Sequence, residues 1–257
     1  MRVAITRVPD GKITMQQTSK VAIVTINRPA ARNAMTRNMW KSLGDIADDI
    51  GSNPKMKVVV LKGVPGEFTA GSDIKEFAAM SLEEADEAFH VMERTIAKFE
   101  ELPIPVIAAI DGPAMGAGLI LSLACDLRIG TPQARLGIPV GKLGITLGPL
   151  FVRRMVRLMG PSFTKELVMT NRILNADEAS SLGLLNRLVA SEELERLTFE
   201  FVQTIMNQSR GSLQAVKKAV AHSYEVQDQE GAWRYVDPID FTEGCIAFAQ
   251  KRKPKFR

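Results

Sequence analysis

Residues 103–144 read PIPVIAAIDGPAMGAGLILSLACDLRIGTPQARLGIPVGKLG, and the expected class of fold follows from this stretch. Residues 105–110 form a short apolar run rich in β-branched side chains, which is typical of a buried strand. Asp111-Gly112-Pro113 predicts a turn, and the glycine-rich segment after it opens an uncharged stretch that ends at Cys125. A strand, a glycine-rich turn and a helix in this order leave free backbone N–H groups at the start of the helix. Such groups can bind a phosphate, a carboxylate or a developing oxyanion.

The composition is that of an ordinary globular protein. The chain has 257 residues, of which 46% are hydrophobic and 24% charged, enough for one large or two small domains. Its two cysteines, Cys125 and Cys245, argue against a disulfide framework and favour a reducing compartment.

The N-terminus lacks the apolar core of a secretory signal. The uncharged stretch between Asp111 and Asp126 is shorter than the roughly 20 residues that span a bilayer. We therefore expect a cytoplasmic protein without a membrane partner.

A small excess of positive charge is concentrated at the C-terminus. The net charge is +4, and residues 251–257 (KRKPKFR) contain five basic side chains. This segment is either a solvated chain end or a contact for a polyanion, which includes the alternative of RNA binding. Aromatic residues are few, and no recognition motif is interleaved with the basic residues, so we expect no nucleic-acid partner.

The hydrophobic pattern predicts alternating strands and helices up to about residue 190 and helices alone after it. Ser81 and Glu84 have the spacing of a capping box, and Gly160 is expected to end a helix. We therefore divide the chain into an α/β core, 1–190, and a helical C-terminal region, 191–257. The predicted strands are 12–17, 20–27, 57–62, 105–110 and 127–129. The predicted helices are 36–50, 81–101, 149–159, 175–183, 192–207, 212–226 and 231–250.

Several common catalytic motifs are absent from the sequence. Gly116-Ala-Gly118 lacks the third glycine of a dinucleotide fingerprint, and no phosphate-binding GxxxxGK[ST] motif occurs. Ser72 does not lie in a GxSxG nucleophile elbow. Only two histidines, His90 and His222, are available as the base of a serine triad, and they are too far from the cysteines in sequence to predict a zinc site. We expect neither a metal nor a permanently bound cofactor. What remains is a pair of glycine-rich loops whose N–H groups could converge on a carbonyl oxygen as an oxyanion hole.

Six segments, in the same order along the chain, resemble the motifs of the crotonase superfamily, also called the enoyl-CoA hydratase/isomerase family. Residues 68–76 resemble its FSAGADIKE motif, and residues 105–126 resemble KPVIAAVNGxAxGGG…ACD. The six segments are 27–34 (NRPAARNA), 68–76 (FTAGSDIKE), 105–126 (PVIAAIDGPAMGAGLILSLACD), 142–145 (KLGI), 182–189 (LGLLNRLV) and 248–256 (FAQKRKPKF).

The resemblance implies a fold, an assembly and a binding site. The fold is a spiral of ββα turns with a helical C-terminal trimerisation region, in a homotrimer or homohexamer. The substrate is an acyl-CoA thioester, so that coenzyme A arrives as part of the substrate. The N–H groups of Ser72 and Ala117 would form the oxyanion hole, at positions where the family usually has alanine and glycine. The residues matching the coenzyme A site are Arg28, Ala34, Ala70, Asp73, Ile74, Lys75 and Gly116.

The sequence departs from the family at the acid–base positions. Hydratases of the family use two glutamates, and the matching residues here are Ile120 and Val140, which we place in the substrate pocket. Hydration needs a base for water and an acid for the α-carbon, so we expect no ordinary hydratase activity. Decarboxylation or thioester hydrolysis needs fewer acids and bases, and a non-catalytic acyl-CoA-binding or assembly subunit is the alternative.

Two groups of titratable residues could replace the missing glutamates. His90, near Asp86, Glu87 and Glu93, is a candidate catalytic residue, although a single helical histidine is more often a surface residue. The second group lies in the C-terminal helices and consists of Tyr235, Asp237, Asp240 and Glu243.

Overall fold

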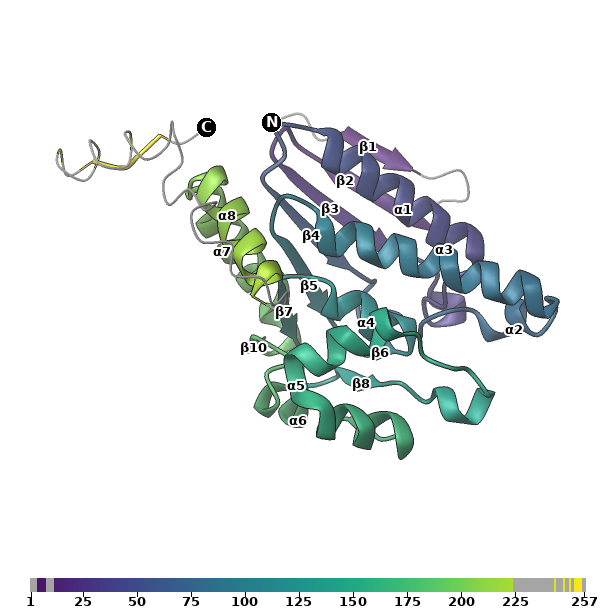
Figure 1. Ribbon diagram of the computed structural model, residues 1–257. Helices are drawn as coiled ribbons and strands as arrows, with labels where there is room; N and C mark the ends of the chain where they lie inside the picture. Colours follow the sequence, from purple (N-terminus) through teal and green to yellow (C-terminus); the bar gives the residue numbers. More distant parts are fainter. Residues whose placement is uncertain are drawn as a thin grey trace.

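The main sheet has seven strands. The computed structural model of the chain describes residues 4–7, 12–223, 243, 247, 250 and 252–255. Figure 1 shows the strands of this sheet. The strand order is β1-β2-β3-β4-β5-β7-β10, with the first three strands antiparallel and the others parallel. The predicted strands 12–17 and 20–27 are confirmed as β2 and β3, which form an antiparallel hairpin with Ile13 opposite Ile26. The strands are β1 (Ala4–Arg7), β2 (Ile13–Gln17), β3 (Val21–Ile26), β4 (Val58–Lys62), β5 (Val106–Ile110), β7 (Leu127–Gly130) and β10 (Arg187–Leu188).

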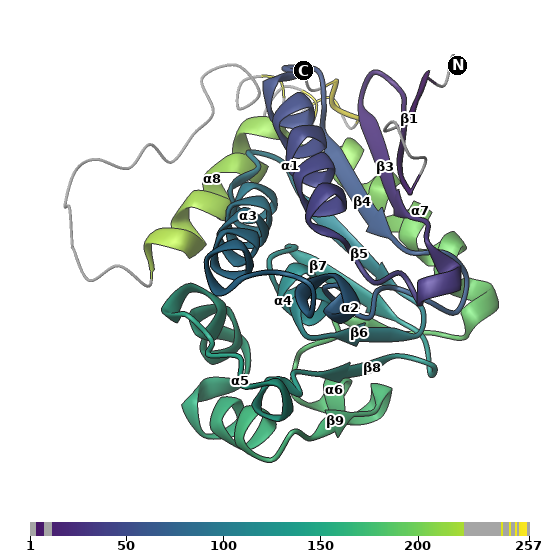
Figure 2. The ribbon, with the colours of Figure 1, turned by 90° about the vertical axis from the view of Figure 1, so that its right-hand side faces the viewer.

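The two faces of this sheet are covered by different helices. Alternate residues of β4 point to opposite faces, so Val59 packs with α1 (Arg37–Ser52) and α3 (Leu82–Glu101), while Val60 packs with α7 (Leu194–Met206). Figure 2 shows α1 and α3 on one side of the sheet and α7 on the other. The central parallel strands β4 and β5 are therefore buried on both faces, which explains why their sequences are nearly continuous apolar runs.

A second, three-stranded sheet was not predicted. It consists of β6 (Pro113–Met115), β8 (Arg135–Gly137) and β9 (Ile173–Leu174), in the order β6-β8-β9. The turn predicted at 111–113 is shorter than expected, because β6 begins at Pro113. Strands of two or three residues have no detectable period, so only their pairing partners define them. The α/β class predicted from the sequence is confirmed.

The starts of several helices agree with the sequence signals. The Ser81 hydroxyl accepts from Glu84 N at 3.2 Å, and Ser81 N donates to Glu84 Oε2 at 2.8 Å, which is the predicted capping box of α3. In α5 (Pro149–Met169) the helical backbone is interrupted at Gly160, as predicted, but the chain resumes a helix at once with Pro161. The remaining helical segments are η1 (Pro29–Ala31), α2 (Ile74–Phe77), α4 (Ala117–Leu123), η2 (Val140–Leu143), α6 (Ala176–Ser181), η3 (Ser191–Glu193) and α8 (Arg210–His222).

The C-terminal region begins with a helix that belongs to the core. Leu194, Val202 and Ile205 of α7 are buried against the main sheet. The division at residue 190 remains a prediction, and the predicted helix 231–250 lies almost wholly outside the described residues. No helix in the described ranges is long and apolar enough to cross a bilayer.

Candidate active site

The site is built around an extended segment, residues 69–73, which is held on both sides by backbone hydrogen bonds. On one side Met115 N of β6 donates to Thr69 O at 3.1 Å. On the other side Met35 N donates to Gly71 O at 2.7 Å, and Asp73 N donates to Met35 O at 2.9 Å. The segment therefore lies between the loop that precedes α1 and the strand that leads into α4, although these parts are far apart in sequence.

Two glycines allow this close backbone approach. Gly71 has φ +92°, and a Cβ there would lie 2.5 Å from the carbonyl oxygen of Met115. Gly116, with φ +54°, caps the start of α4. The next residue, Ala117, is the first of α4 and is not among the residues with positive φ. Position 117 can therefore hold an alanine, because the residue with positive φ is Gly116 and not Ala117.

The backbone N–H groups of Ser72 and Ala117 are both unused within the described part of the chain. The hydrogen bonds of the extended segment involve its neighbours Gly71 and Asp73, and the early turns of α4 use the N–H groups of Leu119 and Ile120. Ser72 and Ala117 both line the same cavity. Two residues with an unpaired backbone N–H therefore line the same cavity, and hydrogen bonds on both sides fix the backbone that carries Ser72.

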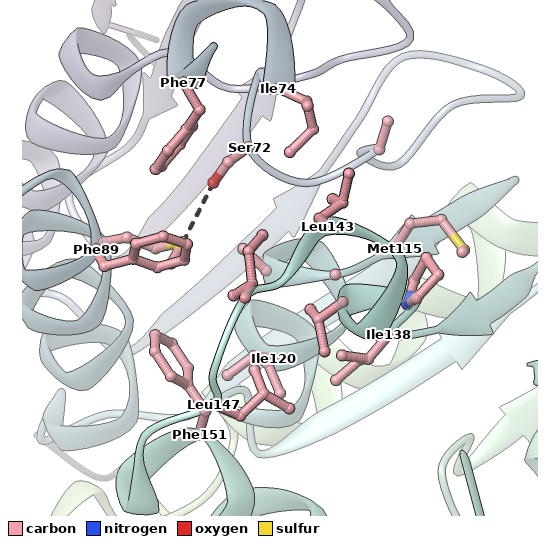
Figure 3. Close-up of a pocket in the computed structure, with 17 residues that line it drawn as sticks. Ser72, Ile74, Phe77, Phe89, Met115, Ile120, Ile138, Leu143, Leu147 and Phe151 are labelled. Atoms are coloured by element: carbon pink, nitrogen blue, oxygen red, sulfur yellow. Dashed lines mark hydrogen bonds between the residues drawn. The ribbon is translucent and has the colours of Figure 1, made fainter. Parts of the chain in front are cut away.

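The cavity is lined by apolar side chains (Figure 3). Its volume is about 140 Å³. No aspartate, glutamate, histidine, lysine, arginine, cysteine or tyrosine is among the described lining residues. The Ser72 hydroxyl is the one strong hydrogen-bonding side chain among them, beside the weakly accepting thioethers of Met92 and Met115. The lining consists of Ala70, Ser72, Ile74, Phe77, Phe89, Met92, Met115, Gly116, Ala117, Ile120, Ile138, Pro139, Val140, Leu143, Ile145, Leu147 and Phe151.

The hydroxyl of Ser72 is held between two side chains from different helices. The indole Nε1–H of Trp40, on α1, donates to Ser72 Oγ at 3.1 Å. Ser72 Oγ lies 3.3 Å from the sulfur of Met92, on α3, and donates to it (Figure 3). Trp40 is 1% exposed, so its indole N–H needs this acceptor.

Seven of the predicted site residues come together around the cavity. Ile120 and Val140, where the resemblance predicts glutamates in hydratases, both face it. Ile120 is buried and Val140 half-buried. The seven are Ala70, Ser72, Ile74, Gly116, Ala117, Ile120 and Val140.

Three more predicted residues form a group beside the cavity. Arg28 Nη1 donates to Ala34 O at 2.8 Å and to Asp73 Oδ2 at 2.6 Å. Burial alone would raise the pKa of Asp73, but the Arg28 guanidinium and the backbone N–H of Lys75 stabilise the carboxylate and hold the pKa below its ordinary value. The Lys75 side chain is exposed. These groups position the loop, and they do not line the cavity.

The structure does not bring His90 to the cavity. His90 is exposed on α3, while its neighbour Phe89 lines the cavity. Glu93 is bound elsewhere, since its Oε1 accepts from Arg154 Nη1 at 2.9 Å. The arginine also bonds Glu100. Neither His90 nor Glu93 is placed to exchange a proton with a ligand in the cavity.

The aromatic part of the cavity was not predicted. Phe77 and Phe89 lie with ring centroids 5.0 Å apart, and Phe151 comes from α5. The spacing of Phe89 and Met92 on one helical face was a detectable signal, but nothing in the sequence paired that face with Phe151. Two methionines, Met92 and Met115, line the cavity, whereas Met35, Met39, Met155 and Met159 are buried in the core.

Part of the basic C-terminal segment has an acidic partner. Arg252 Nη1 lies 2.7 Å from Glu243 Oε1, and Lys255 N donates to the same oxygen at 2.7 Å. These bonds lower the pKa of Glu243 to about 2. Glu243 is thus an ion-pair residue here. The other candidates of that region, Tyr235, Asp237 and Asp240, lie outside the described residues.

Comparison with known proteins finds close similarity over most of the chain. Residues 16–257 match the family model described as "Enoyl-CoA hydratase/isomerase". The chain is 35% identical to "Probable enoyl-CoA hydratase 2, mitochondrial" of Arabidopsis thaliana, over 93% of this chain and 82% of the relative. It is 31% identical to human "Methylglutaconyl-CoA hydratase, mitochondrial", over 92% of this chain and 74% of the relative.

Solved structures agree with this result. An enoyl-CoA hydratase/carnithine racemase from Magnetospirillum magneticum superposes with a TM-score of 0.90 at 29% identity, covering 96% of this chain and 95% of the other. An enoyl-CoA hydratase from Bacillus anthracis gives a TM-score of 0.89 at 31% identity, covering 95% and 98%. These likenesses confirm the predicted fold.

Proposed function

The chain belongs to the enoyl-CoA hydratase/isomerase family, whose members act on acyl-CoA thioesters, and we propose that its cavity holds the acyl group of such a thioester. The carbonyl oxygen lies between the N–H groups of Ser72 and Ala117. Two fixed donors aimed at that oxygen stabilise the enolate more than the ground-state carbonyl, because the oxygen gains negative charge as the enolate forms. Coenzyme A is bound as part of the substrate and not as a resident cofactor.

The observation that carries this proposal is the pair of unused N–H groups in residues that line one apolar cavity. The Ser72 N–H lies between residues whose backbone groups are paired, and the Ala117 N–H is one of the unpaired donors at the start of a helix, so both are available to an acceptor from outside the chain. The pairing of Arg28 with Asp73 supports the donor of Ser72, because it fixes the loop immediately after it. Ile74 and Leu143 are 43% and 49% exposed and also line the cavity, which marks its opening. The coenzyme A portion leaves the protein there, near the exposed Lys75.

The reaction we propose is one that needs no proton-transferring side chain. Ile120 and Val140 carry no acid or base, and no other described lining residue supplies one. Loss of carbon dioxide from a suitable acyl group leaves an enolate whose α-carbon takes a proton from water. Hydrolysis of the thioester uses water as the nucleophile and releases free coenzyme A. The same absence of titratable groups supports a second candidate, an acyl-CoA-binding subunit that carries out no reaction.

We further propose that the protein is a homotrimer or homohexamer, as the family resemblance implies. No residue of α8 is buried in the single chain, and Val216 and Val220 of this helix are 55% and 56% exposed. Phe199 of α7 is 59% exposed. These side chains fit a contact with another copy, and light scattering of the purified protein tests the assembly. A monomer at micromolar concentration would contradict it.

The function is tested by incubating the purified protein with a panel of acyl-CoA thioesters in heavy water and analysing the products by mass spectrometry. Loss of carbon dioxide or release of free coenzyme A would identify the proposed chemistry, and deuterium uptake at the α-carbon would identify the enolate. Binding with no change in any thioester would favour the second candidate. Addition of water to an enoyl thioester at the rate of an ordinary hydratase would contradict the proposal.

A further inference from the structure

The Ser72 hydroxyl has hydrogen-bonding capacity that the protein does not use fully. A hydroxyl group offers one donor and two acceptor lone pairs. One lone pair accepts from the Trp40 indole, and the second has no donor within the described part of the chain. The proton is directed at the thioether of Met92, at 3.3 Å. A thioether is a weak acceptor, so little is lost when the proton turns to an oxygen.

The hydroxyl is directed toward the part of the cavity that holds the acyl chain. In Figure 3 the Ser72 oxygen points to the side of Phe77 and Phe89, and away from Met115. Its bond to the sulfur of Met92 on α3 fixes that direction. Because Met115 immediately precedes the turn that leads into α4, the side chain faces away from the proposed position of the carbonyl oxygen. The hydroxyl is therefore not a third donor to that oxygen.

We infer that the Ser72 hydroxyl selects acyl groups that carry an uncharged oxygen, a hydroxyl or a keto group, on the third carbon. The inference rests on the proposed placement of the thioester carbonyl at the Ser72 N–H. A hydroxyl substituent donates to the free lone pair of Ser72 Oγ, and a keto substituent accepts the proton now directed at Met92. Among the other described side chains of the lining, only the thioethers of Met92 and Met115 can accept a hydrogen bond, and only weakly, and none can donate one.

Covalent geometry favours the third carbon. In Ser72 the N–H and the hydroxyl are separated only by Cα and Cβ. In the acyl group the carbonyl oxygen and an oxygen on the third carbon are separated by a similarly short path. When the carbonyl oxygen is bound at the N–H, the substituent can reach Oγ at an ordinary O–H···O distance of about 2.8 Å. If Ser72 were alanine, a ligand hydroxyl buried here would give up its hydrogen bonds to water and gain none from the protein. Because that loss weakens binding of the hydroxy compound alone, the serine determines specificity.

Isothermal titration calorimetry with two saturated thioesters, butanoyl-CoA and 3-hydroxybutanoyl-CoA, tests the inference. Both enantiomers of the hydroxy compound are used. We expect one of them to bind the wild-type protein about three- to tenfold more tightly than butanoyl-CoA. In Ser72→Ala we expect this preference to disappear, so that the ratio of the two dissociation constants falls to about one. The ratio is the readout, because Ser72 also belongs to the proposed thioester site. If the Ser72 hydroxyl served only as the acceptor for the Trp40 indole N–H, the wild-type protein would show no preference between the compounds.

A second variant separates hydrogen bonding from the shape of the cavity. Met92→Leu conserves volume and removes the sulfur that now accepts the Ser72 proton. We expect it to keep the preference for the hydroxy compound. Loss of the preference in Met92→Leu, or equal binding of all three compounds by the wild type, would overturn the inference and leave the proposed function intact. If no thioester binds at all, the proposed function fails and this inference with it.

Discussion

Arg28 and Asp73 form a part-buried ion pair, with 2.6 Å between Nη1 and Oδ2, that joins the loop before α1 to the loop before α2. The same guanidinium nitrogen donates to the carbonyl oxygen of Ala34. Asp73 also caps α2 by accepting from Lys75 N at 3.1 Å. One carboxylate therefore fixes both the end of the segment that carries Ser72 and the start of the next helix.

This ion pair predicts how stability depends on pH. The pKa of Asp73 is held below its ordinary value of 3.8, so the carboxylate contributes stability above that pH and loses it as the pH falls through the lower, folded value. In Arg28→Met the folded pKa rises toward 3.8. The difference in unfolding free energy between wild type and variant is expected to be constant at neutral pH and to shrink below pH 3.8. Urea unfolding at a series of pH values measures it.

Arg94→Met is the matched control for this experiment. Arg94 pairs with Glu87 on the surface, where the two side chains are 61% and 48% exposed. Exposed pairs contribute about 0–1 kcal/mol, so this variant should differ little from the wild type. A pH-independent difference between wild type and Arg28→Met would contradict the assignment to Asp73.

Restoring two carboxylates should restore hydration if the rest of the site is intact. Ile120 and Val140 line one cavity, so Ile120→Glu with Val140→Glu places an acid and a base beside the proposed enolate. General acid–base catalysis is worth about 10²–10⁴-fold, and we expect hydration of crotonyl-CoA to rise by at least about 100-fold over the wild type. The control, Ile120→Gln with Val140→Gln, has similar volume and no titratable group. Equal rates in the two double variants would disprove the role of the carboxylates.

Gly71→Ala should disrupt thioester binding. The new methyl group would meet the carbonyl oxygen of Met115 at 2.5 Å in a left-handed conformation, so the segment carrying Ser72 must move. The strain costs at least about 2 kcal/mol. Gly66→Ala is the control, because Gly66 also has positive φ but nothing lies within 4 Å of its added Cβ. It should cost about 1 kcal/mol and leave binding unchanged. Calorimetric binding of butanoyl-CoA by both variants checks the prediction, and tight binding by Gly71→Ala would refute it.

Arg154, which does not line the cavity, joins two helices that do, and its substitution should destabilise the protein. It is 2% exposed and joins Glu93 and Glu100 of α3 to α5, the helices that supply Phe89 and Phe151. Arg154→Met removes the arginine that pairs with Glu93, while Glu100 keeps Arg153 and Arg157 at 3.8 and 3.6 Å. We expect a loss of about 3 kcal/mol in unfolding free energy, because the largely buried Glu93 carboxylate loses its partner. Arg196→Met, on the exposed surface of α7, should cost less than about 1 kcal/mol. Urea denaturation compares them, and equal losses would contradict the prediction.

An acyl group with a terminal carboxylate should bind poorly. No described side chain of the cavity lining is cationic, so a carboxylate must give up its water there without a partner. A substrate of the proposed decarboxylation bears the same cost in its ground state, and the cost is relieved as the carboxylate leaves as neutral carbon dioxide. We expect succinyl-CoA to bind at least about tenfold more weakly than pentanoyl-CoA, which has a similar length. Competition titration of the two compounds measures this ratio. Equal affinity would mean that the acyl end lies outside the apolar cavity.

Local sequence signals predicted the elements that depend on local interactions. The capping box of Ser81 and Glu84 starts α3 where expected, and the strand predicted at 57–62 is present as β4, Val58–Lys62. The signals failed where pairing is long-range. The three strands of the second sheet have two or three residues each, and residues distant in sequence hold them together. For the same reason the helix after Gly160 was missed, because Gly160 is a local end signal and only the packing of α5 continues the helix.

The sequence by itself determined the fold class and the family, because these depend on the order of motifs along the chain. It also predicted the two N–H groups of the proposed oxyanion hole, and it shows that Ile120 and Val140, at the positions that the resemblance matches to glutamates, carry no titratable group. Only the tertiary structure decided that His90 points to solvent, that the cavity lining has no acid or base, and that the Ser72 hydroxyl lies between Trp40 and Met92. Each of these depends on which faces of α1, α3 and α5 turn toward one another, and burial of apolar surface across the whole molecule sets that choice.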